Sequence, residues 1–140
     1  MAASNLPWDL DHALLRRLEK RVIVNLPNEE ARIKMIKKFI PQEKQKDLQI
    51  DDFVKLLDGY SGSDIRLVCK EALMKGVRRA ISLIESENVK NSEKNEKILY
   101  EKKLEAVTNE DFRESLKNTK PASLYRESEY IKWMEKFGSF

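Results

Sequence analysis

The stretch GYSGSDIRLVCKEA, residues 59–72, joins a glycine-rich turn to the longest apolar-periodic segment of the chain. Beyond the turn, apolar residues recur at the three- and four-residue spacing of a helix with one buried face. They are Ile65, Val68, Cys69, Ala72, Val77, Ala80, Ile81 and Ile84. Gly59 is suited to end a preceding helix, and the turn at residues 59–64 is suited to begin the next. The segment therefore predicts a long helix that faces a core.

Shorter helices are expected on both sides of this segment, at residues 28–40, 51–59, 110–117 and 122–137. Asn28 is a favoured N-cap, with Glu29 and Glu30 near the positive end of the helix dipole. Thr108 and Asn109 both offer a cap for the helix that follows them. Between these helices, residues 85–103 are dense in charge and nearly free of core residues, which predicts a mobile insertion.

The N-terminal part of the sequence predicts a different kind of structure. Asp11 can cap a helix over residues 12–20, and RVIVNL, residues 21–26, reads as a buried strand closed by Pro27. One strand alone cannot satisfy its backbone groups. We therefore expect a C-terminal fragment that begins partway through a larger α/β domain. Residues 1–27 would be its remnant, residues 28–120 a helical domain and residues 121–140 a C-terminal helix.

Composition excludes several classes of protein. With 27 basic and 24 acidic residues the net charge is +3, which fits a solvated surface and not a nucleic-acid-binding block. No apolar run is long enough to span a membrane, and no signal peptide is visible. Cys69 lies in the apolar stripe and is expected to be core, not a nucleophile. His12 is the only histidine, so no metal site of the ordinary kind is expected.

Two adjacent arginines follow the apolar residues of the segment at 12–20. On a helix, Leu14, Leu15 and Leu18 share one side, while Arg16 points nearly opposite and Arg17 lies on the flank. The pattern leaves two interpretations open. One is a solvated basic face, and the other is a pair of guanidinium groups held for a phosphate on another molecule.

The combination of motifs resembles a known family. ASNLPWDLDHALLRRLEKRVIVNLP, residues 3–27, followed by GYSGSDI, is similar to the second half of a meiotic-group AAA ATPase. That group contains katanin, spastin, fidgetin and the ATPase that disassembles ESCRT-III filaments. Within it, RRLEKR, NTKPA and YIKWMEKFGS look most like the katanin catalytic subunits of the A-like kind. The implied fold class is mainly α, a helical lid preceded by the last helix and strand of a nucleotide-binding domain.

The resemblance implies a role for five residues. Asn5 would be the sensor-1 residue that orients the attacking water. Arg16 and Arg17 would be arginine fingers offered to the nucleotide of a neighbouring subunit. The alternative for Arg17 is a contact within its own subunit. Gly62 and Ser63 would approach the adenine and ribose through a helix N-terminus, whereas Asp64 is expected to be a cap residue. Trp133, Tyr130 and Phe137 are expected to dock the last helix onto the lid.

The implied activity is ATP hydrolysis in a homo-hexamer, with ATP and Mg²⁺ as cofactors and microtubule severing as the result. Tubulin and a regulatory katanin subunit would be partners, in a cytoplasmic, cytoskeleton-associated setting. The sequence contains no GxxxxGK[ST] phosphate loop and no acidic Walker B pair, so these 140 residues are expected to be inactive alone. Two alternatives remain: another meiotic-group ATPase, of the ESCRT-III, spastin or fidgetin type, or a short non-enzymatic regulator of full-length subunits.

Overall fold

The computed structural model of the protein describes residues 2–88, 105–121 and 126–138. The described residues form helices and turns, and the predicted mainly α class is confirmed. In chain order the elements are η1 (Pro7–Asp9), α1 (His12–Arg17), α2 (Glu29–Phe39), η2 (Gln42–Lys44), α3 (Ile50–Leu56), α4 (Gly62–Asn88), α6 (Asn109–Asn118) and α7 (Glu127–Phe137).

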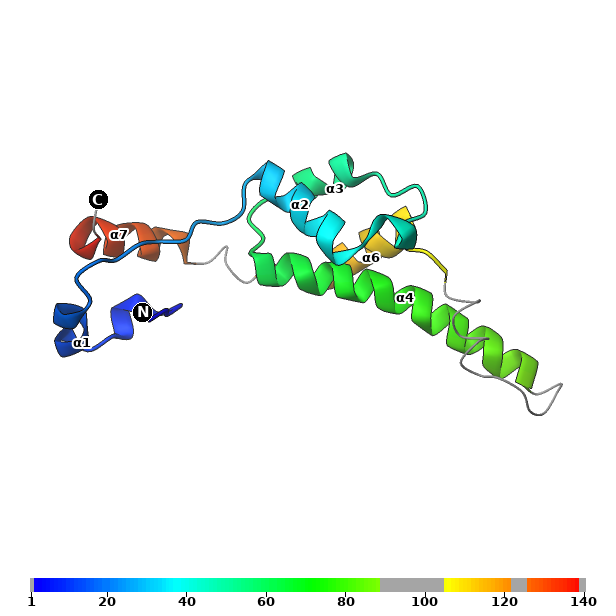
Figure 1. The fold of residues 1–140 in the computed structure, drawn as a ribbon, viewed down its shortest axis with the longest axis horizontal. Helices are drawn as coiled ribbons and strands as arrows, with labels where there is room; N and C mark the ends of the chain where they lie inside the picture. The colour runs from blue at the N-terminus through cyan, green and yellow to red at the C-terminus, as the bar shows by residue number, and fades with distance from the viewer. Residues whose placement is uncertain (1, 89–104, 122–125, 139–140) are drawn as a thin grey trace.

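These elements gather in two places along the long axis of the molecule (Figure 1). Helices α2, α3 and α6 pack around α4, and we call this group the helical body. Residues 5–21 and α7 lie together at the other end, and we call them the terminal cluster. The first and last described helices are thus neighbours, although more than a hundred residues separate them.

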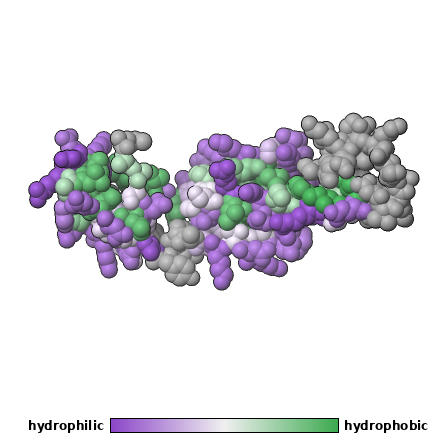
Figure 2. Space-filling model, turned by 90° about the horizontal axis from the view of Figure 1, so that it is seen from below, coloured by the Kyte–Doolittle hydropathy of each residue, from purple (hydrophilic) through white to green (hydrophobic). Residues whose placement is uncertain are grey.

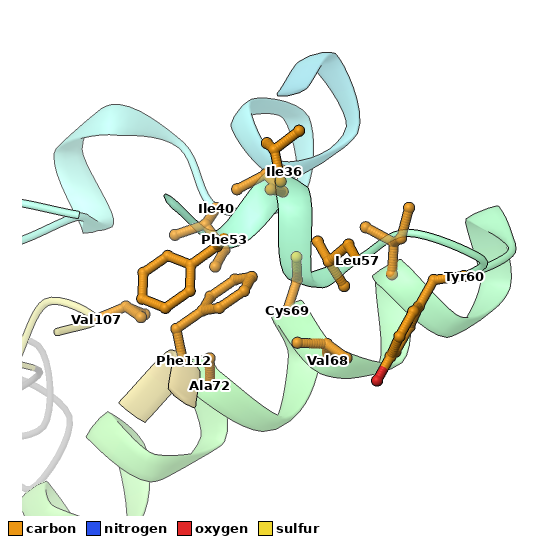
Figure 3. Packing of buried hydrophobic residues seen from close by; sticks show 12 residues of the cluster. Ile36, Ile40, Phe53, Leu57, Tyr60, Val68, Cys69, Ala72, Val107 and Phe112 are labelled. Atoms are coloured by element: carbon orange, nitrogen blue, oxygen red, sulfur yellow. The ribbon is translucent and has the colours of Figure 1, made fainter. Parts of the chain in front are cut away.

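The core of the helical body lies on the predicted stripe of α4 (Figure 3). Phe53 of α3 and Phe112 of α6 pack ring against ring with centroids 4.6 Å apart. The other fully or nearly fully buried members are Ile36, Ile40, Val54, Leu57, Tyr60, Ile65, Val68, Cys69, Ala72 and Val107. Removing this much apolar surface from water is the main stabilising term of the helical body, because each large apolar side chain contributes about 1.5–3 kcal/mol when fully buried.

Gly76 marks the closest approach between α4 and the segment that precedes α6. It is buried, and a Cβ atom at this position would lie 2.6 Å from the carbonyl oxygen of Glu105. The stripe therefore continues through a glycine, whereas the predicted core residue Ile81 is exposed. Further along the segment that contains Glu105, Val107 exchanges backbone hydrogen bonds with Lys44 and Lys46, at 2.8 and 2.9 Å.

An ion-pair network ties α4 to the start of α6. The Arg79 guanidinium grips the Asp111 carboxylate with two nitrogens, at 2.5 and 2.9 Å, and its Nε donates to Glu105 at 2.9 Å. The Asp111 carboxylate also accepts from the amide and hydroxyl of Thr108, at 3.0 and 2.9 Å. Burial alone would raise the pKa of Asp111, but Arg79 and Thr108 hold that pKa below its ordinary value.

The terminal cluster is built from the two ends of the described chain. Trp8 of η1 packs on Tyr130 of α7 with ring centroids 5.2 Å apart, and the Arg126 guanidinium lies 5.8 Å from the Trp8 ring. Arg21 donates to the backbone oxygens of Phe137, at 2.8 Å, and Leu15, at 2.5 Å. The cluster is therefore held by a few aromatic and polar contacts and by the buried side chain of Leu15.

The predicted strand at residues 21–26 is wrong. These residues form neither helix nor strand, and Val22 and Val24 are 71% and 92% exposed. The alternation survives, since Arg21 and Ile23 are partly buried between exposed neighbours. A strand needs a neighbour to receive its backbone hydrogen bonds, and none of the described residues supplies one.

The predicted docking of the last helix is also wrong. The contacts of Tyr130 and Phe137 go to the terminal cluster, where the Tyr130 hydroxyl donates to the Asn5 carbonyl, and not to the helical body. Trp133 packs against Phe137 of its own helix, with ring centroids 5.6 Å apart. Helical spacing correctly identified an apolar face but could not say which partner it meets.

Boundaries differ elsewhere in smaller ways. Helix α1 ends at Arg17, not residue 20, and α4 runs to Asn88, so the first residues of the predicted insertion are helical. Residues 89–103 of that insertion, and the predicted start of the last helix at 122–125, lie outside the described residues. Helix α2 begins after its predicted cap Asn28. Helix α6 begins at Asn109, one residue earlier than predicted, and Thr108, one of the two predicted cap candidates, caps it.

Candidate functional site

The N-terminus of α4 is closed by a reciprocal cap. The Ser61 hydroxyl accepts from the Asp64 amide at 3.2 Å, and the Asp64 carboxylate accepts from the Ser61 amide and hydroxyl at 3.0 and 2.8 Å. This is the capping-box arrangement, with aspartate in the position more often held by glutamate. Asp64 is therefore a cap residue, as predicted, and its carboxylate is occupied.

The first two amides of α4 take no part in this cap. No hydrogen bond is recorded within the described residues for the N–H groups of Gly62 and Ser63, the first two residues of α4. Early helix amides have no intrahelical acceptor, and the helix dipole favours polar or negative groups near them. Ser63 is exposed, and Gly62 lies beside Met35 of α2.

Gly62 is not required by the packing of this chain. A Cβ atom there would meet the Met35 methyl at 3.4 Å, which is ordinary contact, and its backbone is not in the left-handed region. Gly62 is partly buried, and the flexible end of the Met35 side chain lies where a Cβ atom would point.

Arg16 and Arg17 end the short helix α1. Asp11 caps that helix by accepting from the Ala13 amide at 3.2 Å, and Leu15 is buried beneath it. Both arginines are exposed, and neither has a hydrogen bond or ion pair recorded within the part of the chain that the structure describes. The helix therefore presents two free guanidinium groups from an anchored base.

Asn5 lies before η1 and is exposed. Its carbonyl accepts from the Tyr130 hydroxyl, and its side chain has no recorded partner among the described residues. The contact holds the backbone of Asn5 to α7 and leaves the amide side chain available.

The five predicted site residues do not meet in one place. Asn5, Arg16 and Arg17 belong to the terminal cluster, whereas Gly62 and Ser63 lie at the end of α4 in the helical body (Figure 1). Residues 18–28 lead from the first group to the second. One copy of the chain therefore does not bring the arginines to the amides.

The other reactive side chains have structural surroundings. Cys69 is buried in the core, and burial raises the pKa of its thiol to about 12. A thiol in this state is a poor nucleophile, as predicted. His12 is exposed at the start of α1. Among the described residues, no three His, Cys, Asp or Glu side chains are grouped to hold a metal ion.

Comparison with known proteins identifies the helical body. Residues 47–91, which hold α3, the turn and α4, match the family described as the AAA+ lid domain. This chain contains an AAA+ lid domain. Two helices outside the matched residues, α2 and α6, complete the core of the lid in this chain.

Katanin subunits are among the curated relatives of the chain. Over 99% of its length the chain is 44% identical to the A-like 2 form of the katanin p60 ATPase-containing subunit of Xenopus tropicalis, and it covers 26% of that protein. It is 38% identical to the A-like 1 form from Homo sapiens, again over 99% of its length, and covers 28% of it. The chain thus spans about a quarter of the length of the curated relatives it matches.

Solved structures agree with the sequence comparison. The chain aligns with the crystal structure of the FIGL-1 AAA domain in complex with ADP at a TM-score of 0.76 and 28% identity, covering 98% of this chain and 44% of that one. It aligns with a structure described as the structural basis for katanin self-assembly at a TM-score of 0.77 and 31% identity, covering 96% and 46%. The likeness includes the terminal cluster as well as the lid.

Sequence reasoning missed several residues that organise the lid. Arg79 and Gly76 looked like ordinary surface and helix positions, because their partners lie about thirty residues away in sequence. The pairing of Thr108 with Asp111 could have been found, since Thr-x-x-Asp is a capping-box spacing. Arg32, a buried arginine in α2, carried no signal that distinguished it from its exposed neighbours.

Proposed function

We propose that this chain is the arginine-finger and lid segment of a katanin-like ATPase that hydrolyses ATP in a hexamer and severs microtubules. The observation that carries the proposal is the pair of exposed guanidinium groups of Arg16 and Arg17 on a helix anchored by Leu15. The katanin relatives suggest the substrate, and the likeness to a structure that explains katanin self-assembly supports the oligomer.

The placement of the residues favours action between subunits. A planar, permanently charged guanidinium is suited to stabilise the charge that develops on a phosphoryl group in transfer. Since Arg16 and Arg17 lie apart from Gly62 within one chain, their target would be the nucleotide of a neighbouring copy. Arg16, which helical spacing places on the side opposite the leucines, is proposed as the main finger, and Asn5 as the residue that orients water.

The nucleotide contact proposed for this chain is limited to the adenine and ribose. ATP, with Mg²⁺ on its phosphates, supplies the phosphoryl group when it is bound. The amides of Gly62 and Ser63, which have no hydrogen-bond partner among the described residues, fit polar groups of the base and sugar, and only the flexible end of Met35 lies beside Gly62. The described acidic residues do not form a magnesium site, so no magnesium ligand is assigned to them.

Three further parts of the proposal rest on the relatives. We propose tubulin as the substrate, the regulatory subunit of katanin as a second partner and a cytoplasmic, cytoskeleton-associated location, because the matched relatives are katanins. None of the described helices is long and apolar enough to cross a membrane. No phosphate loop is present in these 140 residues, so we also propose that they do not hydrolyse ATP alone.

Substitution of the finger tests the proposal in the complete ATPase. Arg16→Ala is expected to lower kcat for ATP about 10³-fold while nucleotide affinity changes little, because a finger acts on the transition state. Arg17→Ala is expected to have a smaller effect. Lys20→Ala is the matched control, since Lys20 is an exposed cation on the same segment.

Mixed hexamers distinguish action between subunits from action within one. Subunits carrying Arg16→Ala are combined with subunits whose phosphate loop is disabled but whose fingers are intact. Partial recovery of ATP turnover supports a finger that acts on its neighbour. Unchanged ATP turnover in a hexamer made only of Arg16→Ala subunits would contradict the assignment of Arg16 as an arginine finger.

A further inference from the structure

The backbone passes between the terminal cluster and the lid twice. It reaches the lid at Pro27, just before α2, and leaves it at Thr119, just after α6. Away from these two crossings, the main contacts between the described helices are made within the lid or within the terminal cluster. The contacts that hold the backbone at these two crossings therefore decide how the terminal cluster is oriented relative to the lid.

The first crossing is held by a buried arginine. The Nη1 of Arg32 donates to the Pro27 carbonyl at 3.2 Å and to the Asp58 carboxylate at 2.8 Å. The Arg32 side chain is 11% exposed, whereas that of Asp58 is 83% exposed. The guanidinium thus joins the backbone of the crossing to the turn between α3 and α4.

The second crossing is held by a buried tyrosine. The Tyr60 hydroxyl donates to the Thr119 carbonyl at 2.8 Å, and both residues are buried. A hydrogen bond in such surroundings is costly to break, because an unpaired group cannot turn to water. The pKa of Tyr60 is raised by burial and by the nearby Asp64 carboxylate, so the hydroxyl keeps the proton that it donates.

Both holding contacts involve one short turn, residues 57–61. Leu57 anchors it in the core, and the Tyr60 amide donates back to the Leu57 carbonyl at 3.1 Å. Gly59 has a φ of 77°, a conformation that favours glycine. Ser61 then closes the turn as the cap of α4. The turn is fixed at both ends, so it is a firm support for the two crossings.

We propose that residues 57–61 are the joint that fixes the orientation of the terminal cluster relative to the lid. Asp58, through Arg32, holds the backbone at Pro27, where the chain enters the lid. Tyr60 holds the backbone at Thr119, where the chain leaves it. Two attachments on one turn remove rotations that a single attachment would allow. The joint does not depend on what binds at Gly62, so a distance tests it and an activity is not needed.

The test uses the 140-residue chain with spin labels on cysteines introduced at His12 and Lys70, which are exposed in the terminal cluster and the lid. Cys69 is buried and its thiol pKa is raised to about 12, so it does not compete for the label. Pulsed electron paramagnetic resonance then measures the distribution of distances between the labels. The joint is weakened by Asp58→Asn and Tyr60→Phe, singly and together.

The parent is expected to give a narrow distribution, and the double variant one about twofold broader, since two bodies with little shared interface move freely once untied. Each single variant should be intermediate. Lys75→Met with Glu114→Gln is the matched control, because it removes an ion pair between α4 and α6 inside the lid. Circular dichroism confirms that each variant is folded.

Two results would contradict the proposal that residues 57–61 fix this orientation. One is a double variant that is folded and keeps the width of the parent distribution. The other is a control variant that broadens as much as the double variant, because the effect would then be general loosening of the lid. If Asp58→Asn with Tyr60→Phe does not fold, Tyr60→Phe alone decides, since it keeps the buried ring and loses only the hydroxyl.

Discussion

Two glycines of α4 illustrate how differently single residues of the same type are constrained. Gly76 is in contact with the backbone of Glu105, which cannot be moved without shifting the segment before α6. Gly62 faces only the end of a flexible methionine side chain. Packing within the chain requires glycine at position 76. It does not require glycine at position 62, so any constraint there comes from something other than packing.

Alanine at each position separates these constraints. Gly76→Ala is expected to lower the free energy of unfolding by about 1–3 kcal/mol, because the new methyl group overpacks a close contact. Gly62→Ala is expected to leave it unchanged within about 0.5 kcal/mol or to raise it, since alanine favours a helix. Urea unfolding followed by circular dichroism measures both in the 140-residue chain.

The Gly62→Ala variant also tests the proposed nucleotide contact. In the complete ATPase, Gly62→Ala is expected to weaken ADP binding, measured by titration calorimetry, with no loss of stability. Equal ADP affinity in the parent and the variant would argue against close approach of the nucleotide at α4. A destabilised Gly62→Ala chain would instead place the constraint in packing against Met35.

At the scale of elements, the attachment of α6 to α4 is electrostatic at its start and apolar along its length. Asp111 is 5% exposed and its charge is compensated by Arg79 and Thr108. Because its pKa in the folded chain is below the ordinary value, the stabilisation is complete above about pH 4 and is lost as the pH falls through the folded pKa.

Thermal unfolding at several pH values measures this term. The parent is expected to lose stability as the pH falls from about 4 through the lowered pKa of Asp111. Asp111→Asn is expected to be less stable by about 2 kcal/mol at neutral pH and less sensitive to pH below about pH 4. Glu110→Gln, an exposed residue of the same helix turn, is the control. An Asp111→Asn variant with the pH profile of the parent would show that other carboxylates dominate.

Much of the element pattern could be predicted from local sequence. The caps at Asn28 and Thr108, the long helix after the turn and the burial of Cys69 follow from spacing and residue preference. The prediction of a strand at residues 21–26 was wrong because a strand depends on a neighbouring strand, which local sequence does not specify. The site could be predicted only as separate motifs, since Arg16 and Gly62 are related by tertiary or quaternary placement.

At the scale of the whole molecule, the two bodies differ in how much holds them together. The lid has a continuous core of buried side chains, whereas the terminal cluster relies on Trp8, Tyr130, Arg21 and Leu15. Apolar surface is visible on the terminal cluster, at the left of Figure 2. Its exposed members and those of the crossing are Leu6, Leu14, Val22, Val24, Leu26 and Ile131.

Removal of one aromatic residue is therefore expected to loosen one body and spare the other. Trp8→Ala should speed hydrogen exchange in α1 and α7, while α4 keeps its protection, because few contacts connect the two bodies. Hydrogen exchange read by mass spectrometry resolves the helices separately. Ile131→Ala, which trims an exposed residue of α7, is the control, and equal loss of protection in α4 would mean that the bodies unfold as one.

The hydrogen bond from Arg21 to the Phe137 carbonyl also orders events during synthesis of the chain. Domains generally fold as units while the ribosome adds about 5–20 residues per second. The lid lies between the two partners in sequence, so all of its helices leave the ribosome before Phe137 does. Arg21 emerges before the lid, yet its partner in α7 emerges only after the lid. The lid is thus able to fold first, and the terminal cluster assembles only when translation of α7 is complete.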